Sequence, residues 1–189
     1  MNGYEHVCKG HLTPLSFIER SASVFPNKAA IVYGEKKYTY HEFGERVNRL
    51  ASALRNAGLK KDDRVAFLCA NTPPMLEAHF GVPLAGGVLV CINTRLAPNE
   101  IKYILNHSGS TFLFCDTEFA GIVAPIRGEL ETVKHVVNCA DLPDHEGLEG
   151  PEYEEFLATG SAAPVPWAVA DEMDSISINY TSGTTGMPK

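Results

Sequence analysis

Four short apolar runs recur at nearly constant spacing through the middle of the sequence, and each ends at a cysteine. The cysteines are 22 or 24 residues apart, and the runs are rich in Val, Leu and Phe without alternation between apolar and polar positions. Continuous apolar runs of this length are typical of strands buried on both faces of a parallel sheet. The pattern predicts strands near residues 65–69, 88–92, 111–115 and 134–138.

Helical signals fill the gaps around these runs. In residues 39–58, Thr39 and Glu42 have the spacing of a capping box, and Gly58 can end the helix. Apolar residues recur on one face of this segment, at Phe43, Val47, Leu50 and Leu54.

Two further helices are predicted to begin at prolines. One starts with Asn71 or Thr72 followed by Pro73, and the other has Pro98 in its first turn. Strand, helix and strand at this repeat length predict right-handed crossovers. The expected fold is therefore α/β, with a mainly parallel sheet flanked by helices.

The remaining segments give weaker signals. Residues 29–40, with Gly34 between two strand-like runs, predict a β-hairpin. Residues 140–174 are rich in Asp, Glu, Gly and Pro, which predicts an irregular surface connection with one short helix in PEYEEFLAT, anchored to the core by Trp167. The alternating sequence SISINY at 175–180 then predicts a strand.

Composition and charge exclude several classes of function. The net charge of −7 without a basic run gives no indication of a nucleic-acid partner. The longest mostly apolar run, at 82–92, is too short to span a membrane, and no signal peptide precedes it, so a cytoplasmic location is expected. Five cysteines without a CxxC pair fit reduced thiols, and a zinc site built from the four strand-end cysteines is the less favoured alternative. The seven histidines are scattered, which favours surface or capping roles.

A glycine- and hydroxyl-rich segment, YTSGTTGMPK at 180–189, directly follows the predicted strand. A glycine-rich loop after a strand can direct backbone N–H groups at a phosphate, and Gly183 and Gly186 allow the close approach. Lys189 adds a positive charge, and hydroxyl donors come from Thr181, Ser182, Thr184 and Thr185. The segment is not a Walker motif, because Pro188 lies five residues after Gly183 and no Lys-Ser or Lys-Thr pair follows. On composition alone, a loop without a ligand remains the alternative.

The order of residues in this segment resembles the phosphate-binding loop of the AMP-forming adenylating enzymes, which include acyl-CoA synthetases, luciferases and the adenylation domains of peptide synthetases. The similarity extends upstream to KYTYHEF at 37–43 and to residues 83–110. Within the second segment, INTRLAPNEI is more similar to acid–CoA ligases than to peptide-synthetase modules, whereas luciferases stay open as an alternative.

The resemblance implies a two-step reaction. A small-molecule carboxylate attacks the α-phosphate of Mg²⁺-bound ATP to give an acyl adenylate and pyrophosphate, and the thiol of CoA then displaces AMP. It implies that the loop, with Gly183 and Gly186, binds the β- and γ-phosphates. The hydroxyl donors would be Thr181, Ser182, Thr184 and Thr185. Lys189 would act as the catalytic residue that offsets charge on the leaving pyrophosphate, and Thr181 would also contact the magnesium ion.

The resemblance stops at residue 189. In the family, the adenine contacts, the acidic magnesium ligand, the ribose aspartate, the acyl pocket and a small C-terminal domain all lie further downstream. Residues 1–189 are therefore expected to form the first part of the large N-terminal, AMP-binding domain of an acyl-CoA synthetase-like fold, inactive by itself and with no oligomeric state specified. The alternative is a free-standing nucleotide- or phosphate-binding module that does not catalyse a reaction.

Overall fold

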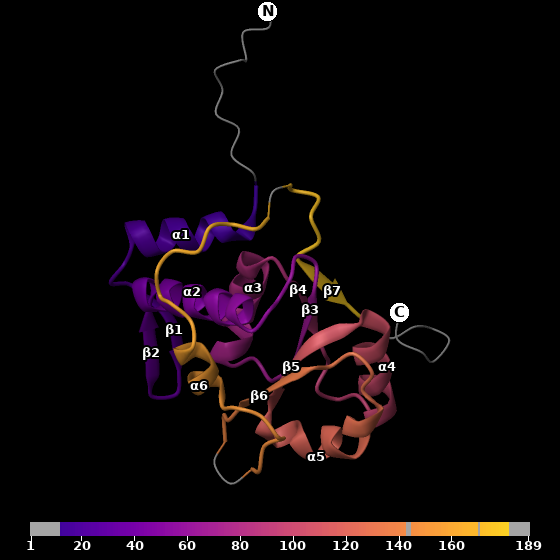
Figure 1. The fold of residues 1–189 in the computed structure, drawn as a ribbon. Helices are drawn as coiled ribbons and strands as arrows, with labels where there is room; N and C mark the ends of the chain where they lie inside the picture. The colour runs from indigo at the N-terminus through magenta and orange to yellow at the C-terminus, as the bar shows by residue number, and fades with distance from the viewer. Residues whose placement is uncertain (1–11, 143–144, 170, 182–189) are drawn as a thin grey trace, which may run out of the picture.

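The computed structural model describes residues 12–142, 145–169 and 171–181 of the chain. Its centre is a five-stranded sheet with the strand order β6-β5-β3-β4-β7, and all four neighbouring pairs are parallel (Figure 1). The strands are β3 (Arg64–Leu68), β4 (Val88–Cys91), β5 (Ser110–Asp116), β6 (His135–Cys139) and β7 (Ser177–Asn179).

The sheet confirms the predicted α/β class. The four strands expected from the cysteine-ending runs are β3 to β6, each within one or two residues of its predicted bounds, and no pair among them is antiparallel in the part of the chain that the structure describes. Two-sided burial explains why their runs lack alternation, since β3 and β5 have buried side chains on both faces. A separate two-stranded antiparallel hairpin consists of β1 (Ala29–Tyr33) and β2 (Lys36–Thr39).

The longest helix, α2 (Tyr40–Asn56), has the predicted ends. The Thr39 hydroxyl accepts a hydrogen bond from the Glu42 amide at 3.2 Å, and the Glu42 carboxylate accepts one from the Thr39 amide at 2.7 Å. Gly58 follows the helix with a φ of 93°, the left-handed conformation that a glycine adopts without strain. The other α-helices are α1 (Pro14–Val24), α3 (Pro73–Ala85), α4 (Pro98–Ser108), α5 (Ala120–Val123) and α6 (Tyr153–Ala158), and the 3₁₀-helices are η1 (Thr117–Phe119) and η2 (Ala124–Glu129).

Helix α1 was not predicted from the sequence. Helix α1 begins at Pro14, and the side chain of Thr13 caps it by accepting a hydrogen bond from the Leu15 amide at 3.2 Å. The signal was present, because Thr followed by Pro is a typical N-cap and first helical residue.

Two hydrophobic layers cover the sheet. Helices α1, α2, α3 and α6 pack on one face, and α4 and α5 pack on the other (Figure 1). The side chains of β3 divide between the layers, because Phe67 packs toward α2 and α3 whereas Leu68 packs toward α4. Phe67 also stacks on Phe114 of β5, with ring centroids 4.3 Å apart. Because α3 and α4 follow adjacent strands, the connections after β3 and β4 leave toward opposite faces.

The strand-end cysteines belong to this core. Cys69, Cys115 and Cys139 are buried and Cys91 is half-buried, all four as free thiols. Burial raises the pKa of the Cys115 thiol, so the thiol stays protonated and unreactive at neutral pH. Among the residues described, no group of His, Cys, Asp and Glu side chains could hold a metal ion. The interpretation of these cysteines as small buried hydrophobes therefore fits better than a zinc site.

The expected role of Trp167 needs correction. In the described part of residues 140–174, Val165 and Val169 pack against the core, whereas the Trp167 side chain is 37% exposed and lines a groove beside α1 and α2. Arg55 holds this segment in place instead, because its guanidinium donates a 2.9 Å hydrogen bond to the Pro166 carbonyl. The path of the connection turns Val165 and Val169 toward the core and leaves the Trp167 ring at the groove.

The close contact between α2 and α3 gives a first testable prediction. A methyl group on Gly81 would lie 2.7 Å from Cδ2 of Leu50, a side chain with no exposed surface. We expect Gly81→Ala to lower the free energy of unfolding by about 1–3 kcal/mol, because the fully packed Leu50 has no room to move. Urea unfolding measures this loss. Gly121→Ala is the matched control, since nothing lies within 4 Å of its added methyl group; a Gly81→Ala variant as stable as this control would contradict the packing argument.

Candidate functional site

The carboxyl ends of all five parallel strands lie along one edge of the sheet. Open parallel sheets bind ligands at this edge, where neighbouring connections diverge to opposite faces. The divergence occurs here between β3 and β4, and β7 lies next to β4 through the pairs Leu89–Ser177, Val90–Ile178 and Cys91–Asn179. The segment after β7 therefore begins at the edge where a ligand is expected.

The sequence of β7 explains its place. Ile178 packs into the hydrophobic layer that contains α4, whereas Ser177 and Asn179 point away and are exposed. This alternation brings Tyr180 back to the Ile178 side, where its ring also packs on the α4 layer. Strand β7 therefore places the exposed residue Thr181 at the carboxyl edge of the sheet.

Most of the predicted site residues lie outside the described part of the chain. These are Ser182, Gly183, Thr184, Thr185, Gly186 and Lys189. Thr181 is described, and its exposed hydroxyl is an oxygen ligand of the type that Mg²⁺ accepts, with phosphate oxygens and water as the usual remaining ligands. Phosphate binding by the loop and magnesium contact by Thr181 stay predictions.

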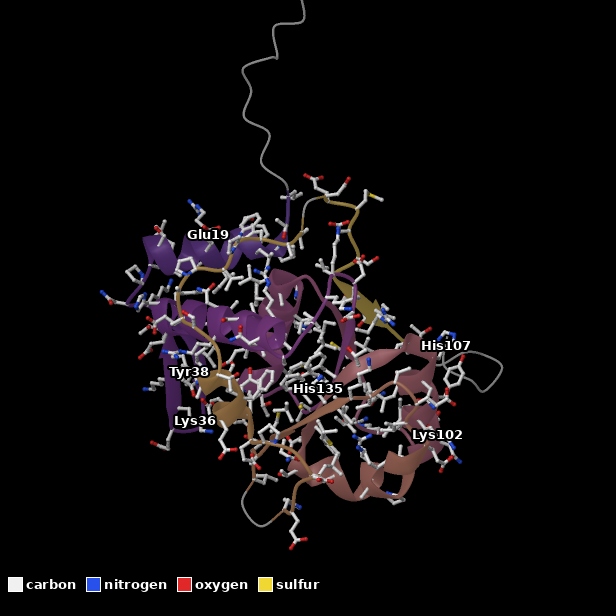
Figure 2. The ribbon with its side chains drawn as sticks, in the orientation of Figure 1. Glu19, Lys36, Tyr38, Lys102, His107 and His135 are labelled. Atoms are coloured by element: carbon white, nitrogen blue, oxygen red, sulfur yellow. The ribbon has the colours of Figure 1, made fainter. Side chains whose placement is uncertain are left out.

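The residue just before the loop is held by a histidine that the sequence interpretation did not single out. His107 lies near the end of α4 (Figure 2). Its Nδ1 is 2.8 Å from the Tyr180 hydroxyl, and the two rings meet edge to face at 5.8 Å. On its other side, His107 stacks on Tyr103 at 5.1 Å. Burial is the main cause of a raised pKa at Tyr180, so its hydroxyl remains a protonated donor at neutral pH.

The helix end that carries His107 is fixed to the sheet. Arg64 at the start of β3 donates hydrogen bonds to the last carbonyls of α4, at 2.6 Å to Ser108 and 2.9 Å to Gly109. Gly109 ends the helix in the left-handed conformation, with a φ of 65°. Cationic groups at a helix C-terminus satisfy its free carbonyl groups and stabilise the dipole. The hydrogen bonds from Arg64 therefore hold the end of α4 that carries His107 against β3.

A second polar cluster lies at the opposite side of the sheet, away from β7. Arg46 forms an ion pair with the fully buried Glu77 at 2.6 Å, and the Tyr153 hydroxyl donates to the same carboxylate at 2.6 Å. Arg46 also pairs with the exposed Glu154 at 2.6 Å and lies over the Tyr38 ring. Tyr38, Arg46, Tyr153 and Glu154 line a cavity of about 180 Å³ near the end of β6. Each charge in the cluster has a partner, which indicates a structural role.

Comparison with known proteins shows strong similarity to one family. The family described as AMP-binding enzyme matches residues 18–189. A 4-hydroxybutyrate–CoA ligase of Metallosphaera sedula is 40% identical over 182 residues, which is 94% of this chain and 33% of the relative. A peroxisomal acetate/butyrate–CoA ligase of Arabidopsis thaliana is 38% identical over 193 residues, again 94% of this chain and 34% of the relative.

Solved structures agree with this similarity. An anthranilate CoA ligase in complex with anthranoyl-AMP superimposes with a TM-score of 0.87 at 26% identity, covering 96% of this chain and 34% of that one. The N-terminal domain of FACL13 from Mycobacterium tuberculosis gives a TM-score of 0.80 at 32% identity, covering 93% and 42%. The chain spans about one third of the length of the curated relatives it matches. None of the helices described here is long and apolar enough to cross a membrane.

Proposed function

The chain belongs to the AMP-binding enzyme family, and from this premise we propose that the protein containing these residues is an AMP-forming acid–CoA ligase. The single observation that carries the proposal is the position of YTSGTTGMPK, which begins where β7 ends at the carboxyl edge of a parallel sheet. The names of the relatives as CoA ligases support the choice of CoA as the acyl acceptor.

In the proposed first step, a carboxylate oxygen forms a bond to the α-phosphorus of ATP. The bond from that phosphorus to the bridging oxygen breaks, and pyrophosphate leaves. All reacting groups are anionic, so the protein contributes mainly by positioning them and by placing donors and positive charge near the leaving group. We assign the phosphate contacts to backbone N–H groups of the loop and to the hydroxyls of Thr181, Ser182, Thr184 and Thr185.

Lys189 would lie near the leaving pyrophosphate, where its ammonium group offsets the charge that develops. Bound Mg²⁺ would supply further charge neutralisation, with the Thr181 hydroxyl as one of its oxygen ligands. In the second step, the CoA sulfur forms a bond to the acyl carbon and AMP leaves with its oxygen. Pyrophosphate has departed by then, so the loop matters less for this step.

We propose a small carboxylic acid as the substrate. The relatives are named for 4-hydroxybutyrate, acetate, butyrate and benzoate, all small acids. Luciferase-like and peptide-synthetase-type activities have no support among these names. A cytoplasmic location stays a prediction, because several of the relatives are named as peroxisomal.

The test is product analysis with the full-length protein. ATP, Mg²⁺ and CoA are incubated with single acids from acetate to long-chain fatty acids and benzoate, and the adenine nucleotides are separated. We expect AMP to form only when both the acid and CoA are present, with the highest rates for small acids. Formation of ADP would refute an AMP-forming reaction. Binding of ATP without turnover for any acid would favour the alternative of a nucleotide-binding module.

A further inference from the structure

A histidine outside the predicted loop holds the residue from which the loop starts. We propose that His107 is a positioning residue for the phosphate-binding loop and acts through its hydrogen bond to Tyr180. The inference rests on the proposed function, because the loop has to bind phosphate for its starting point to matter. The inference adds His107 to the proposed phosphate site, although His107 lies 73 positions before Tyr180 in the sequence.

The backbone alone fixes the start of the loop weakly. Strand β7 has three residues and pairs with β4, and this pairing ends at Asn179. Tyr180 is therefore the last residue before Thr181 whose side chain contacts the body of the protein. Its hydroxyl is joined to His107 and its ring packs on the α4 layer, so these contacts determine the direction in which the chain leaves the sheet.

His107 is suited to this task because its ring is held on two sides. It stacks on Tyr103 at an interplanar angle of 21° and meets Tyr180 edge to face at 80°. The end of α4 is in turn tied to β3 by Arg64. Nδ1 therefore presents a hydrogen-bonding partner in a fixed position to the Tyr180 hydroxyl. Groups that support a binding element from behind limit its motion and improve the geometry of ligand contacts.

Three variants separate the hydrogen bond from simple packing. His107→Phe removes the acceptor and keeps an aromatic ring against Tyr103. His107→Asn keeps an acceptor oxygen near the position of Nδ1, and Tyr180→Phe removes the donor from the other side. Lys102→Ala is the matched control, because Lys102 is on the same helix as His107 (Figure 2) and forms an ion pair with Glu129 at 2.6 Å.

The first measurement needs no ligand and uses the 189-residue chain. Amide hydrogen exchange in β7, whose pairing with β4 ends at Asn179, should become about three- to tenfold faster in His107→Phe and in Tyr180→Phe, the effect of losing one neutral hydrogen bond beside the end of the strand. His107→Asn and Lys102→Ala should exchange at close to the wild-type rate. Unchanged melting temperatures would show that the variants fold.

The second measurement is the affinity of the same chain for inorganic pyrophosphate with Mg²⁺, followed by NMR titration. We expect about three- to tenfold weaker binding for His107→Phe and for Tyr180→Phe, and no further loss in the double variant, because both changes remove the same bond. Recovery in His107→Asn would indicate the acceptor and not the ring.

The two readouts separate the two proposals. Absence of pyrophosphate binding by the wild-type chain would count against the proposed loop function, while the exchange rates in β7 would still test His107. Wild-type exchange rates throughout β7 in both His107→Phe and Tyr180→Phe would overturn the positioning role. So would losses of affinity that add up in the double variant, since independent effects cannot come from one shared hydrogen bond.

Discussion

Replacing Arg46 with methionine should lower the free energy of unfolding by about 3–5 kcal/mol, which is a large part of the stability of a chain of this size. The reason is the burial of Glu77, the ion-pair partner of Arg46. The Glu77 side chain has no exposed surface and its carboxylate has two partners, Arg46 and the hydroxyl of Tyr153. Removal of the guanidinium leaves a buried carboxylate without a counter-charge, and methionine itself fills most of the vacated volume. Urea unfolding at neutral pH measures the loss.

The loss of stability in Arg46→Met should depend on pH in a defined direction. Burial is the main cause of a raised pKa at Glu77, and the charge of Arg46 opposes it. Without Arg46 the folded-state pKa rises further, whereas the unfolded-state pKa is unchanged. The penalty of Arg46→Met should therefore be smallest at low pH, where Glu77 is protonated in the folded state of both proteins, and should grow as the pH rises through the raised folded-state pKa of Glu77 in the wild type.

Two controls test the source of this effect. The Glu154 side chain, the second partner of Arg46, is 68% exposed. Glu154→Gln should therefore lower the free energy of unfolding by less than about 1 kcal/mol. Arg46→Met combined with Glu77→Gln removes both charges, keeps an acceptor for the buried Tyr153 hydroxyl and should recover most of the lost stability. An equal loss in the single and the double variant would show that the packing of Arg46, and not the charge of Glu77, determines the result.

Replacing Lys189 with alanine in the full-length protein should slow adenylation by about 100- to 1,000-fold, the usual effect of removing one donor that stabilises charge in a transition state. Lys189 belongs to the proposed phosphate-binding loop, and pyrophosphate is the group on which negative charge develops. The rate of acyl-adenylate formation in a single turnover measures the effect. Lys189→Arg keeps the charge and should retain part of the activity.

The second step provides the contrast for Lys189. Thioester formation from preformed acyl adenylate and CoA should be affected much less by Lys189→Ala, because pyrophosphate is absent from that reaction. Lys102→Ala, which removes an exposed ion pair with Glu129, is the control for loss of a surface charge. Equal slowing of both steps would contradict a role for Lys189 at the leaving group.

Local sequence signals predicted most of the fold because its elements are locally determined. The apolar runs of β3 to β6 reflect burial on both faces, and the ends of α2 follow from short-range hydrogen bonds at Thr39 and Glu42. Helix α1 carried equally local signals and could have been predicted. The wrong expectation for Trp167 had another cause, because the position of that side chain depends on the space above α2 and α3, which local patterns do not record.

The polar contacts behind the site could not be predicted in the same way. Arg46 and Glu77 are 31 residues apart, and His107 and Tyr180 are 73 residues apart. Their meeting depends on how α2 packs on α3 and on the pairing of β7 with β4, which are properties of the folded chain. The order of residues in 180–189, in contrast, indicated phosphate binding directly, because that chemistry is contained in one continuous segment.

Exchange of labelled pyrophosphate into ATP tests the central claim most directly, because it reports acyl-adenylate formation without CoA. With the full-length protein, Mg²⁺ and a small carboxylic acid, we predict exchange that depends on the acid, whereas the 189-residue chain alone should stay at background. None of the residues to which we assign a role within 1–189 holds the carboxylate in line with the α-phosphate. Acid-independent exchange by the full-length protein, or robust exchange by residues 1–189 alone, would contradict the proposed reaction or its placement.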